Sequence, residues 1–280
     1  MAPRTPVAQT LGGYRQAAPP PALAAMLECA WVHAIAGNTD PRCPAHQVLP
    51  DPSVNLVFMC RRDEEGRVDA PRLALIGPIL RPYPLALRPA HEIVAVKLHP
   101  EWSRPLLGAQ AREHADRIDD LHEVNDAAGP LLDKLACTRH WSEASRLLTG
   151  FIQTTQSRMA TSAGRQARQH EAAMALRRAP LRHSVSAAAA DCGVGPRHFR
   201  RLFEVATGIT PKSYSRIRRL LQLLATADAV QRPDWATLAL AGGYSDQSHM
   251  VNEFRDITGL TPTALLRERR LEAGLYRSRA

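Results

Sequence analysis

The chain has 280 residues and a mass of 30.8 kDa, enough for two domains of ordinary size. Its composition, 45% hydrophobic and 22% charged, is that of a globular protein, and no apolar run of about 18 residues is present to cross a membrane. The N-terminus, Met1-Ala-Pro-Arg-Thr-Pro6, lacks the apolar core of a secretory signal, so we expect a cytoplasmic protein. The five cysteines are odd in number and widely spaced, which predicts reduced thiols.

Charge is distributed unevenly along the chain. Residues 1–150 hold 16 Lys and Arg against 17 Asp and Glu, whereas residues 151–280 hold 20 against 10. Only three of the 36 basic residues are lysines, so the positive half is an arginine surface, suited to bidentate contact with phosphate or guanine. A basic half joined to a neutral half is typical of a polyanion-binding domain attached to a partner domain, although a biased genome also enriches arginine.

The first half of the chain alternates between turn residues and short apolar segments. Residues 1–21 contain five prolines and little periodicity, and we expect a disordered leader there. Four strands are predicted next, at 54–59, 73–76, 83–87 and 93–98. In the last of them Val94, Val96 and Leu98 share one face and leave Lys97 and His99 on the other. These patterns favour a small antiparallel sheet or barrel.

Helical spacing begins after Pro100, around Trp102, again at 131–135, and then over 141–157. A polar stretch near 158–182 marks the expected domain boundary, although residues 165–178 have the spacing of a helix that opens the next domain. We therefore predict an α+β protein. An N-terminal domain over 22–160 combines a small, barrel-like antiparallel sheet with helices, and an all-α domain follows over 165–270.

The basic half contains an internal repeat. A shift of 51 residues superimposes two copies of Thr-Gly-Ile/Leu-Thr-Pro, at 207–211 and 258–262, together with His198 on His249 and Phe203 on Phe254. In each copy the glycine ends one helix in the left-handed conformation, the second threonine caps the next helix, and proline occupies its first turn. Upstream of each copy lie a short helix and a glycine-bearing turn, which completes a helix-turn-helix pattern.

The helical wheels of the two second helices separate core from surface. Phe199, Leu202, Phe203 and Ala206 form the buried stripe of the first, and Met250, Phe254 and Ile257 that of the second. Residues 211–227 are predicted to form a long connecting helix with a core face made by Tyr214, Ile217, Leu220, Leu221 and Leu224. Two second helices held about 34 Å apart would enter successive major grooves of B-DNA. The alternative is that each polar face is a solvated helix surface without a partner.

The C-terminal 100 residues or so resemble the DNA-binding domain of the AraC/XylS transcriptional regulators. The resemblance is carried by Gly193-Val-Gly-Pro-Arg-His-Phe-Arg-Arg-Leu-Phe203 and by Gly243-Tyr-Ser-Asp-Gln-Ser-His-Met-Val-Asn-Glu-Phe-Arg255, each followed by its Thr-Gly segment. It implies a sequence-specific regulator, more commonly an activator, that binds double-stranded DNA and RNA polymerase. The implied DNA-binding residues are Arg197, His198, Arg200, Arg201, Gln247, Ser248, Val251, Asn252 and Arg255. Asn252 replaces a frequent arginine of the family, which favours adenine recognition through its amide.

The N-terminal half is similar to a sensor-like region often joined to such domains, through Leu49-Pro-Asp-Pro-Ser-Val-Asn-Leu-Val-Phe58 and Val94-Ala-Val-Lys-Leu-His-Pro100. This resemblance implies effector sensing, self-association as a homodimer, or both. We expect no cofactor and no enzymatic activity, because the common phosphate-loop, dinucleotide and zinc-protease motifs are missing. An enzyme with a DNA-binding tail would require the scattered candidates for a metal or catalytic site to converge; these are His33, His46, Asp51, His91 and His99.

Overall fold

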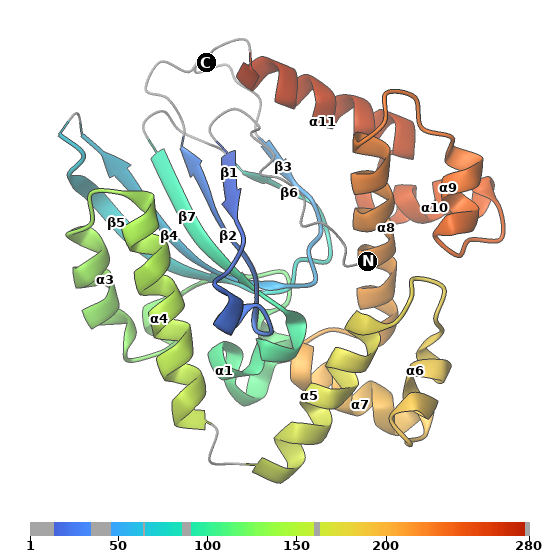
Figure 1. The fold of residues 1–280 in the computed structure, drawn as a ribbon, viewed down its shortest axis with the longest axis horizontal. Helices are drawn as coiled ribbons and strands as arrows, with labels where there is room; N and C mark the ends of the chain where they lie inside the picture. The colour runs from blue at the N-terminus through green and yellow to red at the C-terminus, as the bar shows by residue number, and fades with distance from the viewer. Residues whose placement is uncertain (1–13, 35–45, 64, 86–90, 160–162, 278–280) are drawn as a thin grey trace.

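The computed structural model describes residues 14–34, 46–63, 65–85, 91–159 and 163–277. A sheet with its covering helices comes first, and a group of helices follows along the chain (Figure 1). This arrangement confirms the predicted α+β class, with an antiparallel sheet domain before a helical domain. No helix in these ranges is both long and apolar enough to cross a membrane. The four cysteines within them are free thiols, and Cys43 lies outside the described residues.

The main sheet has six strands in the order β1-β2-β7-β4-β5-β8, with all neighbours antiparallel. Strands β3 and β6 pair as a second, two-stranded sheet. The bounds are β1 Tyr14–Ala17, β2 Leu27–Ala34, β3 His46–Val48, β4 Val54–Arg62, β5 Val68–Ile76, β6 Tyr83–Leu85, β7 His91–Leu98 and β8 Ile118–Asp120. The predicted strand at 83–87 therefore ends at Leu85 within the described residues.

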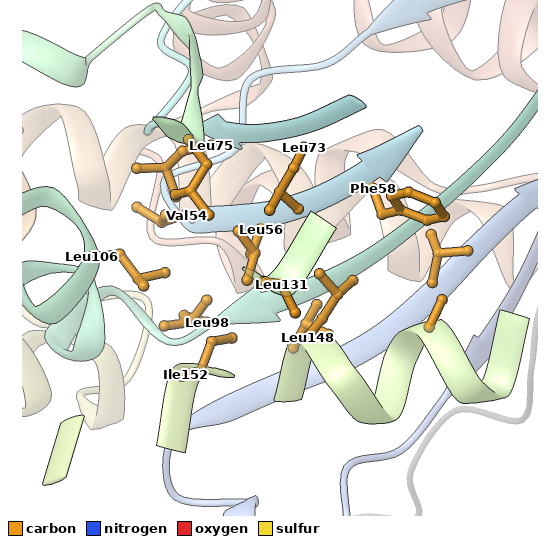
Figure 2. Close-up of a cluster of buried hydrophobic side chains, with 14 of the residues drawn as sticks. Val54, Leu56, Phe58, Leu73, Leu75, Leu98, Leu106, Leu131, Leu148 and Ile152 are labelled. Atoms are coloured by element: carbon orange, nitrogen blue, oxygen red, sulfur yellow. The ribbon is translucent and has the colours of Figure 1, made fainter. Parts of the chain in front are cut away.

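One face of the main sheet forms the core of the N-terminal half. Val94, Val96 and Leu98 are buried on this face, as their alternation predicts, and Lys97 lies on the other. Two helices cover the face, α3 Ala128–Ala136 and α4 Trp141–Met159, with Leu131, Leu148 and Ile152 directed at the strands (Figure 2). The short elements that complete this half are η1 Pro21–Leu23, η2 Pro100–Trp102, α1 Arg104–Leu107, η3 Gly108–His114 and α2 Leu121–Val124.

The prediction of a disordered leader was wrong for its last part. Tyr14–Ala17 form the edge strand β1, which pairs with β2. The ring of Tyr14 lies 5.9 Å from that of Trp31, so an aromatic contact stabilises this strand. The prolines and low apolar content of residues 1–21 as a whole favour disorder. Pro21–Leu23 form a 3-10 turn, with Leu23 in the core. Residues 1–13 of the expected leader lie outside the described residues.

The C-terminal half is built from seven helices in the described part of the chain. They are α5 Ala163–Arg178, α6 Val185–Asp191, α7 Pro196–Thr207, α8 Pro211–Asp228, α9 Trp235–Ala241, α10 Gln247–Thr258 and α11 Pro262–Arg277. In Figure 1, α6 and α9 both lie on the side of α8 that faces away from the sheet, near opposite ends of that helix. On α8, Leu221 was predicted to be buried, but Leu223 is the buried residue instead. Leu221 is half-buried, because its side of the helix faces the N-terminal half.

The two halves pack against each other through the segment that follows β7. The buried carboxylate of Glu101 accepts a hydrogen bond from Nε of Arg177 on α5 at 2.7 Å, and its carbonyl oxygen lies 3.2 Å from Nδ1 of His170. The ring of Trp102 meets His170 edge-on at 4.6 Å, and Arg104 donates to the side chain of Gln169. Helix α5 is thereby held against the N-terminal half.

The duplicated glycines provide a matched test of this packing. Gly208 and Gly259 end α7 and α10 with φ of 80° and 78°, so alanine is strained at both, by about 1–2 kcal/mol. A Cβ at Gly208 would also lie 2.4 Å from the carbonyl oxygen of Ala111, whereas one at Gly259 meets no described atom within 4 Å. We expect Gly208→Ala to lower the free energy of unfolding by about 2 kcal/mol more than Gly259→Ala does. Equal losses in urea denaturation would contradict this docking.

Candidate nucleic-acid interface

The first helix-turn-helix motif consists of α6 and α7. Ser184 caps α6 by accepting from the backbone N–H of Ala187 at 3.0 Å, and Gly193, with φ of 64°, makes the turn. Helix α7 begins after Gly195 with Pro196 in its first turn, and Gly195 offers no side-chain cap. Phe199, Leu202, Phe203 and Ala206 are all buried, as the wheel predicts, and they pack on α5 and α6.

The opposite face of α7 carries positive charge. Arg197, Arg200 and Arg201 are all exposed, and among the described residues none of them forms an ion pair. His198 is half-buried, and its Nδ1 lies 3.3 Å from Nη2 of Arg201. Three guanidinium groups without carboxylate partners on one helix face are available for phosphate oxygens and for the edge of guanine.

The second motif consists of α9 and α10. Asp234 caps α9, and Asp246 caps α10 by accepting from the backbone N–H of His249 at 2.7 Å. Met250, Phe254 and Ile257 are buried as predicted. Of the residues predicted to contact DNA, Gln247, Ser248, Asn252 and Arg255 are exposed. Val251, predicted to point outward, is instead half-buried against the core of this motif.

The cap of α10 gives a test that is confined to the second motif. Hydrogen bonds from backbone N–H groups, above all that of His249, lower the pKa of Asp246, so its carboxylate is stabilised in the folded state. The contribution of this carboxylate to the free energy of unfolding is complete above the ordinary pKa of Asp. It is lost as the pH falls through the lowered pKa of Asp246 in the folded state. We expect Asp246→Ala to weaken DNA binding by loosening the start of α10, whereas Asp246→Asn, which keeps a capping oxygen, retains most of it. Gel-shift titration of both variants checks this, and equal affinities would contradict it.

A buried carboxylate connects the second motif to α8. Glu253, on the inner side of α10, accepts from Nε of Arg216 at 3.1 Å, from Nη2 of Arg219 at 3.0 Å and from the hydroxyl of Tyr244 at 2.6 Å. The guanidinium carbon of Arg219 also lies 4.7 Å from the centre of the Tyr244 ring, and Arg216 bonds Asp256. No motif or spacing in the sequence predicts this network. Its signal is the polar residue Glu253 inside the otherwise apolar stripe of α10.

The N-terminal half packs behind the first motif and leaves the arginine face of α7 open. Gly208 at the end of α7 lies against Ala111, and Leu80 and Ala115 pack on the core that contains Phe199 and Phe203. The exposed residues Arg197, Arg200 and Arg201 lie outside this contact. The arginine face of α7 is therefore accessible in this arrangement of the two halves.

Of the scattered candidates for a metal or catalytic site, Asp51 and His99 line one cavity between the two halves. Within the described part of the chain, no three His, Cys, Asp or Glu side chains form a group that could hold a metal ion. Asp51 instead pairs with Nζ of Lys97 at 2.9 Å. Burial, reinforced by nearby Arg177, lowers the pKa of His99. The side chain of His46 lies outside the described residues.

Comparison with protein families gives two matches. Residues 188–268 match a helix-turn-helix domain family, and residues 15–119 match a domain of unknown function, DUF6597. A search of curated proteins found no match to the chain.

Solved structures of ToxT from Vibrio cholerae are distantly similar. A 1.65 Å structure of ToxT is 8% identical over 85% of this chain and 97% of its own, with a TM-score of 0.41. A second, of wild-type ToxT bound to an unsaturated fatty acid, is 9% identical over 80% and 89%, with a TM-score of 0.38. Scores of this size describe a remote resemblance only.

Proposed function

We propose that this chain is a DNA-binding transcriptional regulator of the AraC type, which inserts α7 and α10 into successive major grooves of one duplex. The match of residues 188–268 to a helix-turn-helix domain family supports this proposal. The observation that carries this proposal is the matched exposure of the two helices. Each buries an apolar stripe and turns a polar face to solvent, and α8 and the Glu253 network join them.

The two helices would make different contacts with DNA. Arg197, Arg200 and Arg201 supply charge for phosphate contacts and bidentate donors for guanine, so α7 provides most of the affinity. On α10, Gln247 and Asn252 present amides that pair with adenine, while Ser248, Val251 and Arg255 border them. His198, one turn before Arg201 on α7, would orient the Arg201 guanidinium through the contact of its Nδ1 with Nη2.

We assign the remaining roles by domain. Residues 165–270 would form the DNA-binding domain and residues 22–160, extended by β1, a sensing or dimerising domain. The chain would act in the cytoplasm as an activator that contacts RNA polymerase, with no catalytic role of its own. Supporting this division, the N-terminal half contacts the core of the first motif through Leu80 and Ala115 and leaves the arginine face of α7 exposed.

Selection of bound duplexes from a random pool by the full-length chain tests the proposal. We expect recovered sites with two conserved segments centred about 10 base pairs apart, one rich in guanine and one containing adenine. Recovery of a single conserved segment, or of no consensus, would contradict recognition by both helices.

A second role, sensing of an effector that controls DNA affinity, is favoured by one observation. A cavity of about 330 Å³ lies where β2, the segment just before β4 and the end of β7 face α5 and α8 of the DNA-binding half. A ligand bound between the halves would change the free energy of any motion of the first motif relative to the sheet, and by linkage the affinity for DNA.

A further inference from the structure

The cavity between the two halves has walls of opposite chemistry. Its sheet wall contains Glu28, Asp51, Ser53 and Lys97, and its helix wall contains Arg177 from α5 and Tyr214, Arg218 and Leu221 from α8. A volume of about 330 Å³ is at the lower end of the range for small-molecule sites. The residues on each wall determine which chemical groups could be held there.

The sheet wall carries excess negative charge. Nζ of Lys97 lies 3.1 Å from Oε1 of Glu28 and 2.9 Å from Oδ2 of Asp51, so two carboxylates share one ammonium. Burial alone would lower the pKa of Lys97, yet the two carboxylates raise it above its ordinary value and keep the side chain charged. Oδ1 of Asp51 accepts from the backbone N–H of Ser53 at 2.9 Å, and Glu28 remains partly exposed. This wall therefore attracts a cationic group.

The helix wall carries a cation without a carboxylate partner. Arg218 donates to the carbonyl oxygens of Leu176 and Ala179 at 2.8 and 2.7 Å, and within the described residues it forms no ion pair. These two bonds hold its guanidinium against the end of α5. Its charge is thus fixed in position at the cavity, where it favours an anion.

Tyr214 supplies an unused hydroxyl beside this cation. The residue is 97% buried, since its exposed fraction is 3%, and its ring packs 5.3 Å from that of Phe203 on α7. Among the described residues its hydroxyl makes no hydrogen bond, although the residue lines the cavity. Burial raises the pKa of this hydroxyl, so it stays protonated and can donate. A hydroxyl that belongs to a cavity-lining residue, has no partner in the described chain and lies near an unpaired guanidinium is suited to donate to a carboxylate.

We propose that this cavity binds a free α-amino acid, with its carboxylate on Arg218 and Tyr214 and its ammonium on Glu28 and Asp51. The ligand would join the sheet to α8, and through Tyr214 and Phe203 to the recognition helix α7. The proposal that an amino acid binds depends only on the residues of the cavity. The proposal that binding changes the affinity for DNA rests on the proposed function.

The test uses the full-length chain and the twenty L-amino acids as probes in a thermal-shift screen, followed by calorimetric titration of any hit. We expect at least one amino acid to raise the unfolding temperature, and its N-acetyl and carboxamide derivatives, which lack one charge each, to bind at least about tenfold more weakly. No shift with any amino acid would overturn the proposal. So would equal binding by either derivative.

Variants place the ligand in the cavity. Tyr214→Phe and Glu28→Gln are each expected to weaken the hit about tenfold, whereas Arg178→Gln, which removes an exposed charge from α5, leaves its affinity unchanged. Unchanged binding by the first two variants would place the ligand elsewhere and overturn the proposal.

DNA titration with and without the amino acid then separates the two levels of inference. A changed DNA affinity supports the regulatory role of the site. An amino acid that binds in the cavity without changing DNA affinity would leave the site in place and remove effector sensing from the proposed function.

Discussion

Replacing Arg197 and Arg201 together with alanine is expected to lower the affinity for a selected DNA site about a hundredfold or more. Each guanidinium contact to guanine or phosphate contributes about 1–3 kcal/mol, and neither side chain has an ion-pair partner in the described part of the chain that would offset its loss. The plot of log affinity against log salt concentration should also become shallower by about one for each phosphate contact removed. Anisotropy titrations at several salt concentrations measure both quantities.

A matched control removes the same charge from the other half. Arg15 and Arg81 are exposed in the N-terminal half, and Arg15→Ala with Arg81→Ala should leave the salt dependence nearly unchanged. If both double variants weakened binding equally, the effect would come from net charge, and α7 would have no special role.

Glu253→Ala is expected to have the largest effect on stability, about 3 kcal/mol. The variant removes the shared acceptor of Arg216, Arg219 and Tyr244, and two guanidinium groups lose the buried carboxylate that compensates them. Glu253→Gln keeps an acceptor oxygen and should lose less. Thermal or urea unfolding of the full-length chain gives the difference in free energy.

The position of this loss is as informative as its size. Because Glu253 lies between α8 and α10, its removal should weaken protection of the second DNA segment in a footprint and leave the first segment protected. Asp256→Ala, which removes an exposed partner of Arg216, is the control and should leave both segments protected. Loss of both segments with Glu253→Ala would show that the network supports the whole domain instead of the second motif.

The features that could be predicted from sequence are those encoded locally. The ends of α7, α8 and α10 follow from Gly208, Thr210 and Asp246, because each acts on backbone groups within a few residues of itself. The buried stripes of α7 and α10 follow from helical spacing, and the face shared by Val94, Val96 and Leu98 follows from strand alternation.

The features that were missed depend on contacts between distant segments. Strand β1 exists because Tyr14 meets Trp31 on β2, and no local pattern in 14–17 indicates it. The Glu253 network joins α8 to α10, and the Glu101 and Arg177 pair joins residues 76 positions apart. The cavity likewise draws its walls from five segments of the chain. Such sites form only when the halves pack together, so composition and periodicity cannot locate them.

The most direct test inserts five base pairs between the two segments of a selected site. Half a helical turn moves the second segment to the opposite side of the duplex, out of reach of α10 while α7 remains bound. We predict that affinity falls to that of a duplex whose second segment is scrambled. Affinity that is unchanged by the insertion would contradict two recognition helices held at the pitch of DNA.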